Sequence, residues 1–239
     1  MVELHILIEG GGQPNAGNIS VAYNTQILRE SLHSFFSRLL DRDDVSIIIS
    51  MEYGYRNAVQ SLLASEAKVK LFVDSDMPKD TLENWFHKVE TENPSKPFVI
   101  PDERKPNIYF IIQEMEAWFL KQPECFEKWA EANGYKRRRL DNDIKSYITD
   151  MATDVEHIAK PSEKVKTLLG NFFEKEIADG RYRHAKYGKL TTAPALLDRL
   201  DLRLLEVKDS ELQRFKNKEG KELLEKSGKN MVETLSLEK

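Results

Sequence analysis

The chain has 239 residues, 40% hydrophobic and 32% charged, a balance typical of a globular protein and not of a disordered one. Its apolar runs, such as 6–8 and 108–112, are too short to cross a bilayer, and no signal peptide is recognisable, so we expect no membrane contact. The net charge of -4 argues against coating nucleic acid by bulk electrostatics, so phosphate contacts must come from local basic clusters. The single cysteine, Cys125, excludes an internal disulfide and a cysteine-based zinc site, and we expect a cytoplasmic protein.

The first half of the chain alternates short apolar runs with helical periodicity. This alternation predicts an α/β fold with a mostly parallel sheet flanked by helices. We expect strands at 4–8, 45–51, 69–73 and 107–113. We expect helices at 26–40, 57–65 and 82–92, and a further helix that begins near Met115, directly after the fourth strand.

The pattern changes at about residue 122. Beyond it we expect helices near 123–133, 141–157, 162–178, 192–200 and 209–226, and no further strand. We therefore divide the chain into an α/β core at 1–121 and a mainly helical C-terminal region at 122–239.

Acidic residues follow three of the four predicted strands. Glu9 ends the first strand, Asp74 and Asp76 follow the third, and Glu114 and Glu116 follow the fourth. In open α/β sheets the carboxyl ends of the strands meet at the edge where ligands bind. Clustered carboxylates repel one another, and a hard cation such as Mg²⁺ or Mn²⁺ removes that repulsion. The sequence therefore predicts a metal site at this edge.

The spacing of these acids refines the prediction. In a continuing strand, Asp74 and Asp76 face the same side and could reach one ion. If a helix begins at Met115, Glu114 and Glu116 diverge by about 200°, and we favour Glu114 as the nearer acid. A single acid after a strand is usually explained by a polar loop or a helix N-terminus, but the convergence of three acidic clusters is better explained by a cation.

These residues also carry a resemblance to a known fold. Glu-Gly after one strand, Asp-x-Asp after a later strand and another acid after the next resemble the Toprim fold of topoisomerases, primases and overcoming-lysogenization-defect (OLD) nucleases. More closely, the chain resembles an uncharacterised prokaryotic family, domain of unknown function 4276, which is considered Toprim-like. The matching stretches are Ile6-Leu-Ile-Glu-Gly10, Gly54-Tyr-Arg-Asn-Ala58, Leu71-Phe-Val-Asp-Ser-Asp76, Gln113-Glu-Met-Glu-Ala-Trp-Phe-Leu120, Lys160-Pro-Ser162, Tyr187-Gly-Lys189 and Ala195-Leu-Leu197.

The resemblance implies roles for the acidic residues. Glu9 would act as a general acid/base or as a metal ligand. Asp74 and Asp76 would hold Mg²⁺ or Mn²⁺. Either Glu114 or Glu116 would complete the acidic cluster.

Two lysines are candidates for a further catalytic role. OLD-type relatives use a lysine beyond the acids, which makes Lys160 and Lys189 the candidates here. The chain also departs from the pattern. Many relatives have a second acid shortly after Glu-Gly, where this chain has Gly-Gly-Gln-Pro-Asn, and Lys121 stands where relatives often have Ala-Asp. These departures leave open whether the site holds one metal or two.

The resemblance implies a magnesium-dependent nuclease that cuts phosphodiester bonds in DNA or RNA. It also implies an effector in a prokaryotic antiphage defence or repair system, with an ABC-type ATPase as partner; a homodimer is a further expectation. One alternative is a non-catalytic Toprim module that binds an ATPase or nucleic acid. Another is a Mn²⁺-dependent nucleotide-sugar glycosyltransferase that uses Asp-x-Asp, although this leaves Glu9 and residues 113–120 unexplained.

The glycine run after the first strand does not fit a nucleotide-binding motif. The spacing from Gly12 to Gly17 matches a P-loop, but Asn18 and Ile19 stand where Lys and Ser/Thr are required. A Rossmann pattern fails because Asn15 occupies the position of the third glycine. We interpret the glycines as permitting a turn and a close backbone approach to a ligand.

Two basic stretches are candidates for contact with nucleic acid. Residues 136–139 read Lys-Arg-Arg-Arg, and residues 181–189 interleave basic residues with tyrosines. Cations contact phosphates, and aromatic rings can stack on unpaired bases. We favour a solvated loop for the first stretch. The predicted nucleic-acid contacts are Arg56, Arg181, Arg183 and Lys186.

Overall fold

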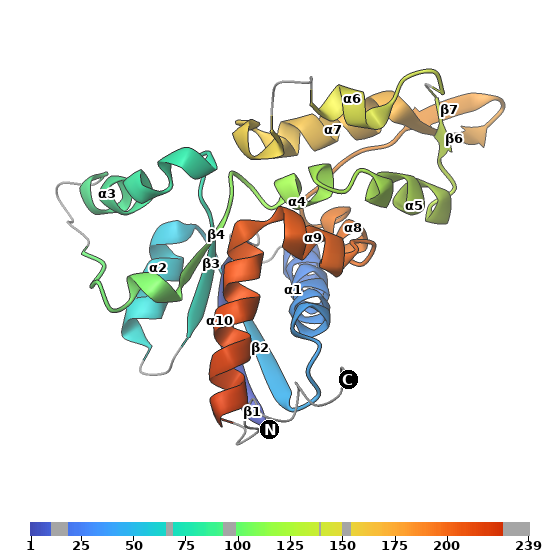
Figure 1. The fold of residues 1–239 in the computed structure, drawn as a ribbon. Coiled ribbons are helices and arrows are strands. Elements are labelled where there is room, and N and C mark those ends of the chain that lie inside the picture. Colours follow the sequence, from blue (N-terminus) through green and yellow to red (C-terminus); the bar gives the residue numbers. More distant parts are fainter. Residues whose placement is uncertain (11–18, 66–68, 93–98, 139, 150–153, 227–239) are drawn as a thin grey trace, which may run out of the picture.

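The computed structural model describes residues 1–10, 19–65, 69–92, 99–138, 140–149 and 154–226. Its centre is a sheet of four parallel strands in the order β2-β1-β3-β4, which confirms the α/β class with a parallel sheet flanked by helices (Figure 1). The strands are β1 (Val2–Glu9), β2 (Val45–Glu52), β3 (Lys70–Asp74) and β4 (Ile108–Ile111).

Both faces of this sheet are covered. On one face, alternate β1 residues such as Ile6 and Ile8 pack with α1 (Ile19–Leu40) and α10 (Ser210–Lys226). Leu7 and Val73 point to the other face, toward α2 (Tyr55–Ala64) and α3 (Glu83–Thr91). Strand residues alternate between faces, so apolar residues in succession along a central strand fill two separate cores.

The helices of the second half lie mainly over the carboxyl edge of the parallel sheet (Figure 1). They are α4 (Glu116–Leu120), α5 (Glu124–Ala132), α6 (Ile144–Ile148), α7 (Pro161–Phe172), α8 (Ala193–Leu197) and α9 (Leu202–Lys208). Short 3-10 turns occupy Lys79–Thr81, Lys105–Asn107 and Val155–His157. No helix among the described residues is long and apolar enough to cross a membrane.

A second sheet corrects our expectation of no strand beyond residue 122. It is antiparallel, in the order β5-β6-β7, with β5 (Lys136–Arg137), β6 (Phe173–Ala178) and β7 (Arg181–His184). The helix expected at 162–178 ends at Phe172, and the chain continues as β6. The turn explains the change, because Asp179 and Gly180 have φ of 50° and 70° and form the Asp-Gly pair that favours a tight hairpin.

Our prediction of a helix at 141–157 is also wrong. Only α6 and the turn at Val155–His157 are helical there, and residues 150–153 lie outside the described ranges. Asp143 starts α6 by accepting a hydrogen bond from the Ser146 backbone N–H. α6 ends at Ile148, with Thr149 already in extended conformation. The remaining predicted elements are present, but α1 begins at Ile19 and not at residue 26, and α9 (Leu202–Lys208) was not expected.

The main core includes residues on both sides of position 121. Phe215 of α10 contacts Phe72 and Tyr109 of the sheet, with ring centroids 5.0 Å and 5.1 Å apart. Phe35 of α1 stacks on Trp118 of α4 at 4.9 Å. The division into regions at 1–121 and 122–239 stays a prediction, and the C-terminal elements supply part of the packing around the first sheet.

Candidate functional site

Three neighbouring strands bring acidic residues to the carboxyl edge of the parallel sheet. β1 ends at Glu9 and β3 at Asp74, and these two strands are hydrogen-bonded neighbours. β4 lies next to β3, so the segment after it brings Glu114 and Glu116 to the same edge. The convergence inferred from the sequence is present.

The chain turns sharply at the end of β3, which changes one expectation. Asp76 has φ of 50°, so the strand does not continue through it, and the condition under which Asp74 and Asp76 would face the same side is not met. The Asp74 side chain is 12% exposed and that of Asp76 is 51% exposed. The Ser75 hydroxyl accepts a hydrogen bond from the Gln113 backbone N–H at 2.8 Å and joins the segments after β3 and β4.

We call Glu9, Asp74, Glu116, Tyr187 and Lys189 the inner cluster. The Lys189 ammonium group donates a hydrogen bond to Asp74 Oδ2 at 2.9 Å, and the Tyr187 hydroxyl donates one to Glu116 Oε1 at 2.5 Å. Among the described residues, the second oxygens of Asp74 and Glu116 have no hydrogen-bond partner, although both are buried. The same is true of Glu9 Oε2. Buried charged oxygens without partners are costly, so this edge of the sheet is built for a ligand or for protons.

Burial and mutual repulsion favour the protonated forms of these acids. Burial, with the charge of Asp74 second, raises the pKa of Glu9 from 4.5 to about 8, and Lys189 opposes the rise. Burial also raises the pKa of Asp74 and that of Glu116, again against the opposing charge of Lys189. Burial lowers the pKa of Lys189, but the charges of Asp74 and Glu116 outweigh it and the net pKa is raised. One ammonium group therefore only partly neutralises three carboxylates.

We call Asp76, Glu114 and Lys160 the outer cluster. The Lys160 Nζ lies 3.9 Å from Asp76 Oδ1 and 3.7 Å from Glu114 Oε1. Glu114 Oε2 accepts a hydrogen bond of 2.7 Å from the backbone N–H of Ser162. This N–H belongs to the first turn of α7, where the helix itself provides no acceptor. Glu114 therefore fixes the start of α7 at this edge of the sheet, and Lys160, which directly precedes α7, lies beside Asp76 and Glu114.

The two clusters place the two acids after β4 differently. Glu114 lies next to Lys160, whereas Glu116 is 1% exposed and lies next to Tyr187. The helix α4 begins at Glu116, as expected from the sequence. Our preference for Glu114 as the nearer acid stays a prediction, and the burial and the unpartnered oxygen of Glu116 make it a second strong candidate for a ligand.

The acids fit a hard divalent cation in their chemistry. Mg²⁺ and Mn²⁺ prefer oxygen ligands, and the inner cluster offers three buried carboxylate oxygens that no other described residue bonds to. No three His, Cys, Asp or Glu side chains within the described ranges already stand in the arrangement of a metal site. The ammonium group of Lys189 lies close to the acids of the inner cluster and supplies positive charge there. Glu9, Asp74 and Glu116 are the residues that would hold the ion.

The predicted nucleic-acid contacts lie on two elements. Arg181 and Arg183 are exposed on β7, and Lys186 is exposed on the segment that leads from β7 to Tyr187. Arg56 lies in the first turn of α2, directly after β2, and therefore at the same edge of the sheet as the acids. The exposed hairpin and the inner cluster are thus joined by a few residues of chain.

The first basic stretch has structural partners. Arg138 pairs with Glu174 at 2.8 Å, and its guanidinium group also contacts His184. Arg137 pairs with Glu127 and donates to a backbone carbonyl. These contacts give the arginines partners within the protein and are consistent with our preference for a stretch that does not bind nucleic acid. Arg139 lies outside the described residues.

Tyr187 and Ser162 are site residues that our sequence reasoning did not assign. Tyr187 stands two residues before Lys189 in a stretch that carried the resemblance, and this proximity was the available signal. Burial and the charge of Glu116 raise its pKa well above 10.0, so the hydroxyl stays a donor. Ser162 contributes a backbone N–H, which no side-chain pattern reports.

Lys121, where the chain departs from the family pattern, has a structural partnership. Its ammonium group lies 2.8 Å from Glu156 Oε1 and 2.8 Å from Asp209 Oδ2, and all three side chains are buried. Asp209 also accepts a hydrogen bond from the Trp118 indole at 3.1 Å. This position therefore ties α4 to the turn at 155–157 and to α10.

The glycine run can be described only at its start. Gly10 has φ of 153°, and a Cβ there would meet Met51 Cε at 3.1 Å, so glycine suits this position. Residues 11–18, where the P-loop-like spacing falls, lie outside the described residues.

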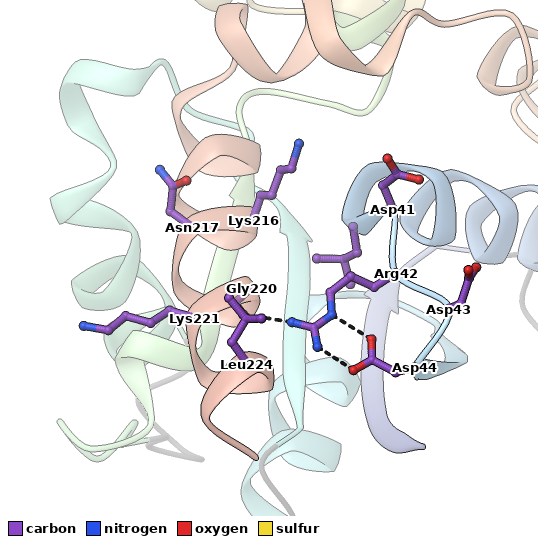
Figure 2. Close-up of a pocket in the computed structure, with 10 residues that line it drawn as sticks. Asp41, Arg42, Asp43, Asp44, Lys216, Asn217, Gly220, Lys221 and Leu224 are labelled. Atoms are coloured by element: carbon purple, nitrogen blue, oxygen red, sulfur yellow. Dashed lines mark hydrogen bonds and ion pairs between the residues drawn. The ribbon is translucent and has the colours of Figure 1, made fainter. Parts of the chain in front are cut away.

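A pocket of about 730 Å³ lies at the opposite, amino-terminal edge of the sheet, between the α1–β2 turn and α10 (Figure 2). Arg42 reaches from this turn to the Gly220 carbonyl of α10 at 3.3 Å and pairs with Asp44 at 2.6 Å. The arginine therefore connects α10 to the turn at this end of the molecule.

The fold and the site define a class: an α/β protein with a buried acidic cluster and two lysines at the carboxyl edge of a parallel sheet. The profile of a family described as Domain of unknown function (DUF4276) matches residues 18–218. The match covers most of the chain, and the protein belongs to this family. Glu9 precedes the matched residues. No curated protein and no solved structure matched the chain.

Proposed function

We propose that this protein is a Mg²⁺- or Mn²⁺-dependent nuclease of the Toprim type, related to OLD nucleases, that hydrolyses phosphodiester bonds in DNA or RNA. The observation that carries the proposal is the inner cluster, in which Glu9, Asp74 and Glu116, at the ends of β1 and β3 and after β4, each bury an oxygen that has no partner among the described residues. Without a cation these acids must hold protons or repel one another. A divalent ion supplies more positive charge than Lys189 alone.

The side chains around this edge suit phosphodiester hydrolysis. A bound divalent ion would polarise the phosphate and lower the pKa of an attacking water. Without a cation the pKa of Glu9 is raised to about 8, and a bound cation would lower it, so Glu9 would serve in its ionised form as a metal ligand or as a general base. Lys189 and Lys160 can stabilise the negative charge that develops on the phosphate. Tyr187 fixes the orientation of Glu116 by its hydrogen bond.

The substrate and partners form the finer part of the proposal. Arg181, Arg183 and Lys186 would contact the phosphate backbone, and Arg56 would do so at the edge itself. The protein would act in the cytoplasm in a prokaryotic antiphage defence or repair system, with an ABC-type ATPase as partner. The resemblance of the motifs supports these expectations.

The deciding experiment is a cleavage assay on purified full-length protein with plasmid DNA and structured RNA. We expect cleavage with Mg²⁺ or Mn²⁺ and none with EDTA. The Asp74→Asn change should lower the rate by at least about 100-fold, because it removes a carboxylate ligand of the ion that would polarise the phosphate. Asp102→Asn is the matched control, since this aspartate is 93% exposed and pairs only with Lys105 among the described residues. Equal rates in the two variants would refute the assignment.

A non-catalytic binding module is the second candidate, favoured by the Lys189–Asp74 hydrogen bond of 2.9 Å. In that case Lys189 serves as the permanent counter-charge of the acids. Calorimetric titration with Mg²⁺ separates the two functions. A module that retains nucleic acid in EDTA, binds no Mg²⁺ and cleaves nothing would support this second candidate. The glycosyltransferase alternative, which uses Asp74 and Asp76, leaves the burial of Glu9 and Glu116 beside Asp74 unexplained.

A further inference from the structure

The two edge strands of the parallel sheet, β2 and β4, differ in whether their outer backbone groups have hydrogen-bond partners. At the β4 edge, Glu211 of α10 accepts a hydrogen bond from the Phe110 N–H at 3.0 Å, and Arg214 donates one to the Ile108 carbonyl at 2.6 Å. Lys218 adds a bond to the Pro106 carbonyl at 2.9 Å. Helix α10 therefore satisfies backbone groups that an added strand would otherwise pair with.

The β2 edge has no such cover among the described residues. Backbone bonds from Val2 to Asp44 and from Gly10 to Glu52 show that the even-numbered residues of β2 face β1. In a parallel ladder the alternate residues then direct both N–H and C=O away from it. These outward residues are Val45, Ile47, Ile49 and Met51, and none of their backbone groups bonds to another described residue on that side.

The sequence of the β2 edge strand is nearly palindromic in residue type about its central residue. Residues 45–51 are Val-Ser-Ile-Ile-Ile-Ser-Met, with Ile48 at the centre and no charged side chain. A second copy turned by a two-fold axis through Ile48 would place Ile47 opposite Ile49 of the second copy. Ser46 would lie opposite Ser50, and Val45 opposite Met51. Each residue whose backbone N–H and C=O point away from β1 then lies opposite another such residue of the second copy, as the hydrogen bonds of an antiparallel ladder require.

We propose that β2 pairs with β2 of a second copy of this chain, antiparallel about Ile48, to form a closed dimer with one continuous sheet. Strong β-formers and the absence of charge are the properties that make an edge strand pair. In the part of the chain that the structure describes, β2 is bare and α10 covers the β4 edge, so pairing stops at two copies and does not extend into a fibre.

The surroundings of β2 fit this arrangement. A groove of about 340 Å³ between α1 and Ile47–Ile49 is lined by Arg29 and Glu30, so identical grooves turned toward each other can pair unlike charges. At the ends, Asp44 would approach Glu52 of the second copy. Arg42 already binds both oxygens of Asp44, at 2.9 Å and 2.6 Å, and offsets this repulsion.

The pairing leaves the acidic site of each copy separate. The two β2 strands run in opposite directions, so the carboxyl edges of the two sheets face opposite sides of the dimer. Each site is built from one chain alone, as the contacts of Glu9, Asp74 and Glu116 require. Dimerisation and nuclease activity can therefore fail or succeed independently in experiments.

The first test is sedimentation velocity on the full chain at micromolar concentration, with twice the mass of one chain expected. Ile48→Lys places two ammonium groups against each other at the axis and should weaken the dimer by at least about tenfold. The side chain of Ile48 is 39% exposed, so the fold should tolerate the change. Ile177→Lys on β6, at 47% exposure, is the matched control and should stay dimeric. Circular dichroism verifies folding of both variants.

The second test is a disulfide that does not depend on tolerance of a charge. Residues opposite each other on such an axis have Cα atoms about 4.5 Å apart, within disulfide reach. Ile48→Cys should therefore cross-link two chains on mild oxidation, whereas Ser46→Cys should not, because it faces position 50. Cys125 is 1% exposed and should stay unreactive. A monomeric wild-type protein would overturn the proposal, as would a dimer that Ile48→Lys leaves intact or one that Ser46→Cys cross-links equally well.

Discussion

At the scale of single residues, Glu9 carries the clearest consequence of the buried acidic cluster. A carboxyl pKa raised from 4.5 to about 8 means that the folded, metal-free protein holds a proton that the unfolded chain releases. Stability from this group is full below pH 4.5 and is lost as pH rises through about 8. The same direction applies to Asp74 and Glu116.

This sign gives a measurable pH dependence. In EDTA the free energy of unfolding of the wild type should fall between pH 4.5 and about 8, by on the order of 5 kcal/mol from Glu9. Glu9→Gln removes the titrating group and should flatten the curve, with a remaining slope from Asp74 and Glu116. Denaturant melts across this pH range measure the effect. Parallel curves for the two proteins would contradict the raised pKa.

Tyr187 is predicted to act as a positioning residue. Tyr187→Phe removes the hydroxyl that donates to Glu116 and leaves the second buried oxygen of that acid without a partner. The dissociation constant for Mg²⁺ should rise by at least about tenfold, because each lost hydrogen bond to a charged group is worth about 1.5–3 kcal/mol. Calorimetric titration measures it, with Tyr182→Phe on exposed β7 as control. Equal affinities in both variants would leave Tyr187 with a packing role only.

At the scale of elements, the β6–β7 hairpin is the feature that periodicity did not reveal. Lys175 and Arg183 form a cross-strand pair in it, and the chain then leads through Lys186 to the inner cluster. The Asp179-Gly180 turn was visible in the sequence, but residues 162–178 also fit a helical pattern. The packing of Phe173 into the core decides in favour of a strand.

The hairpin is predicted to contact nucleic acid through its arginines. Charge reversal at Arg181 and Arg183 should weaken DNA binding and reduce the slope of log affinity against log salt, by up to about 0.9 per lost phosphate contact. Filter-binding measurements at several salt concentrations test this, with charge reversal at Arg203 on α9 as control. An unchanged slope in the hairpin variant would exclude these contacts.

At the scale of the whole molecule, two buried ionic connections join distant parts of the chain. Lys70 of β3 pairs with Glu219 of α10 at 2.7 Å, with both side chains 2% exposed. Lys121 joins α4 to Glu156 and Asp209. Both connect the sheet or its edge to segments that are far apart along the chain, so they contribute to a single cooperative structure.

Removal of Lys121 should lower stability without changing the site. Lys121→Ala leaves Glu156 and Asp209 buried without their shared cation, and the unfolding free energy should fall by about 3–5 kcal/mol. The Mg²⁺ affinity of the folded fraction should stay unchanged. Chemical denaturation and calorimetric titration measure the two quantities, and Lys145→Ala, which removes an exposed ion pair with Glu124, is the control. A loss below about 1 kcal/mol would mean that solvent reaches this cluster.

The sequence by itself determined the parallel sheet and the edge at which Glu9, Asp74 and the acids after β4 meet. It could do so because strand–helix alternation forces the carboxyl ends of parallel strands to one side. The tertiary structure alone decided that Lys189 lies against Asp74, that Tyr187 holds Glu116 and that β2 is an edge strand with no cover among the described residues. The two side-chain contacts join residues 115 and 71 positions apart. They depend on how helices and strands pack in space, which local periodicity does not encode.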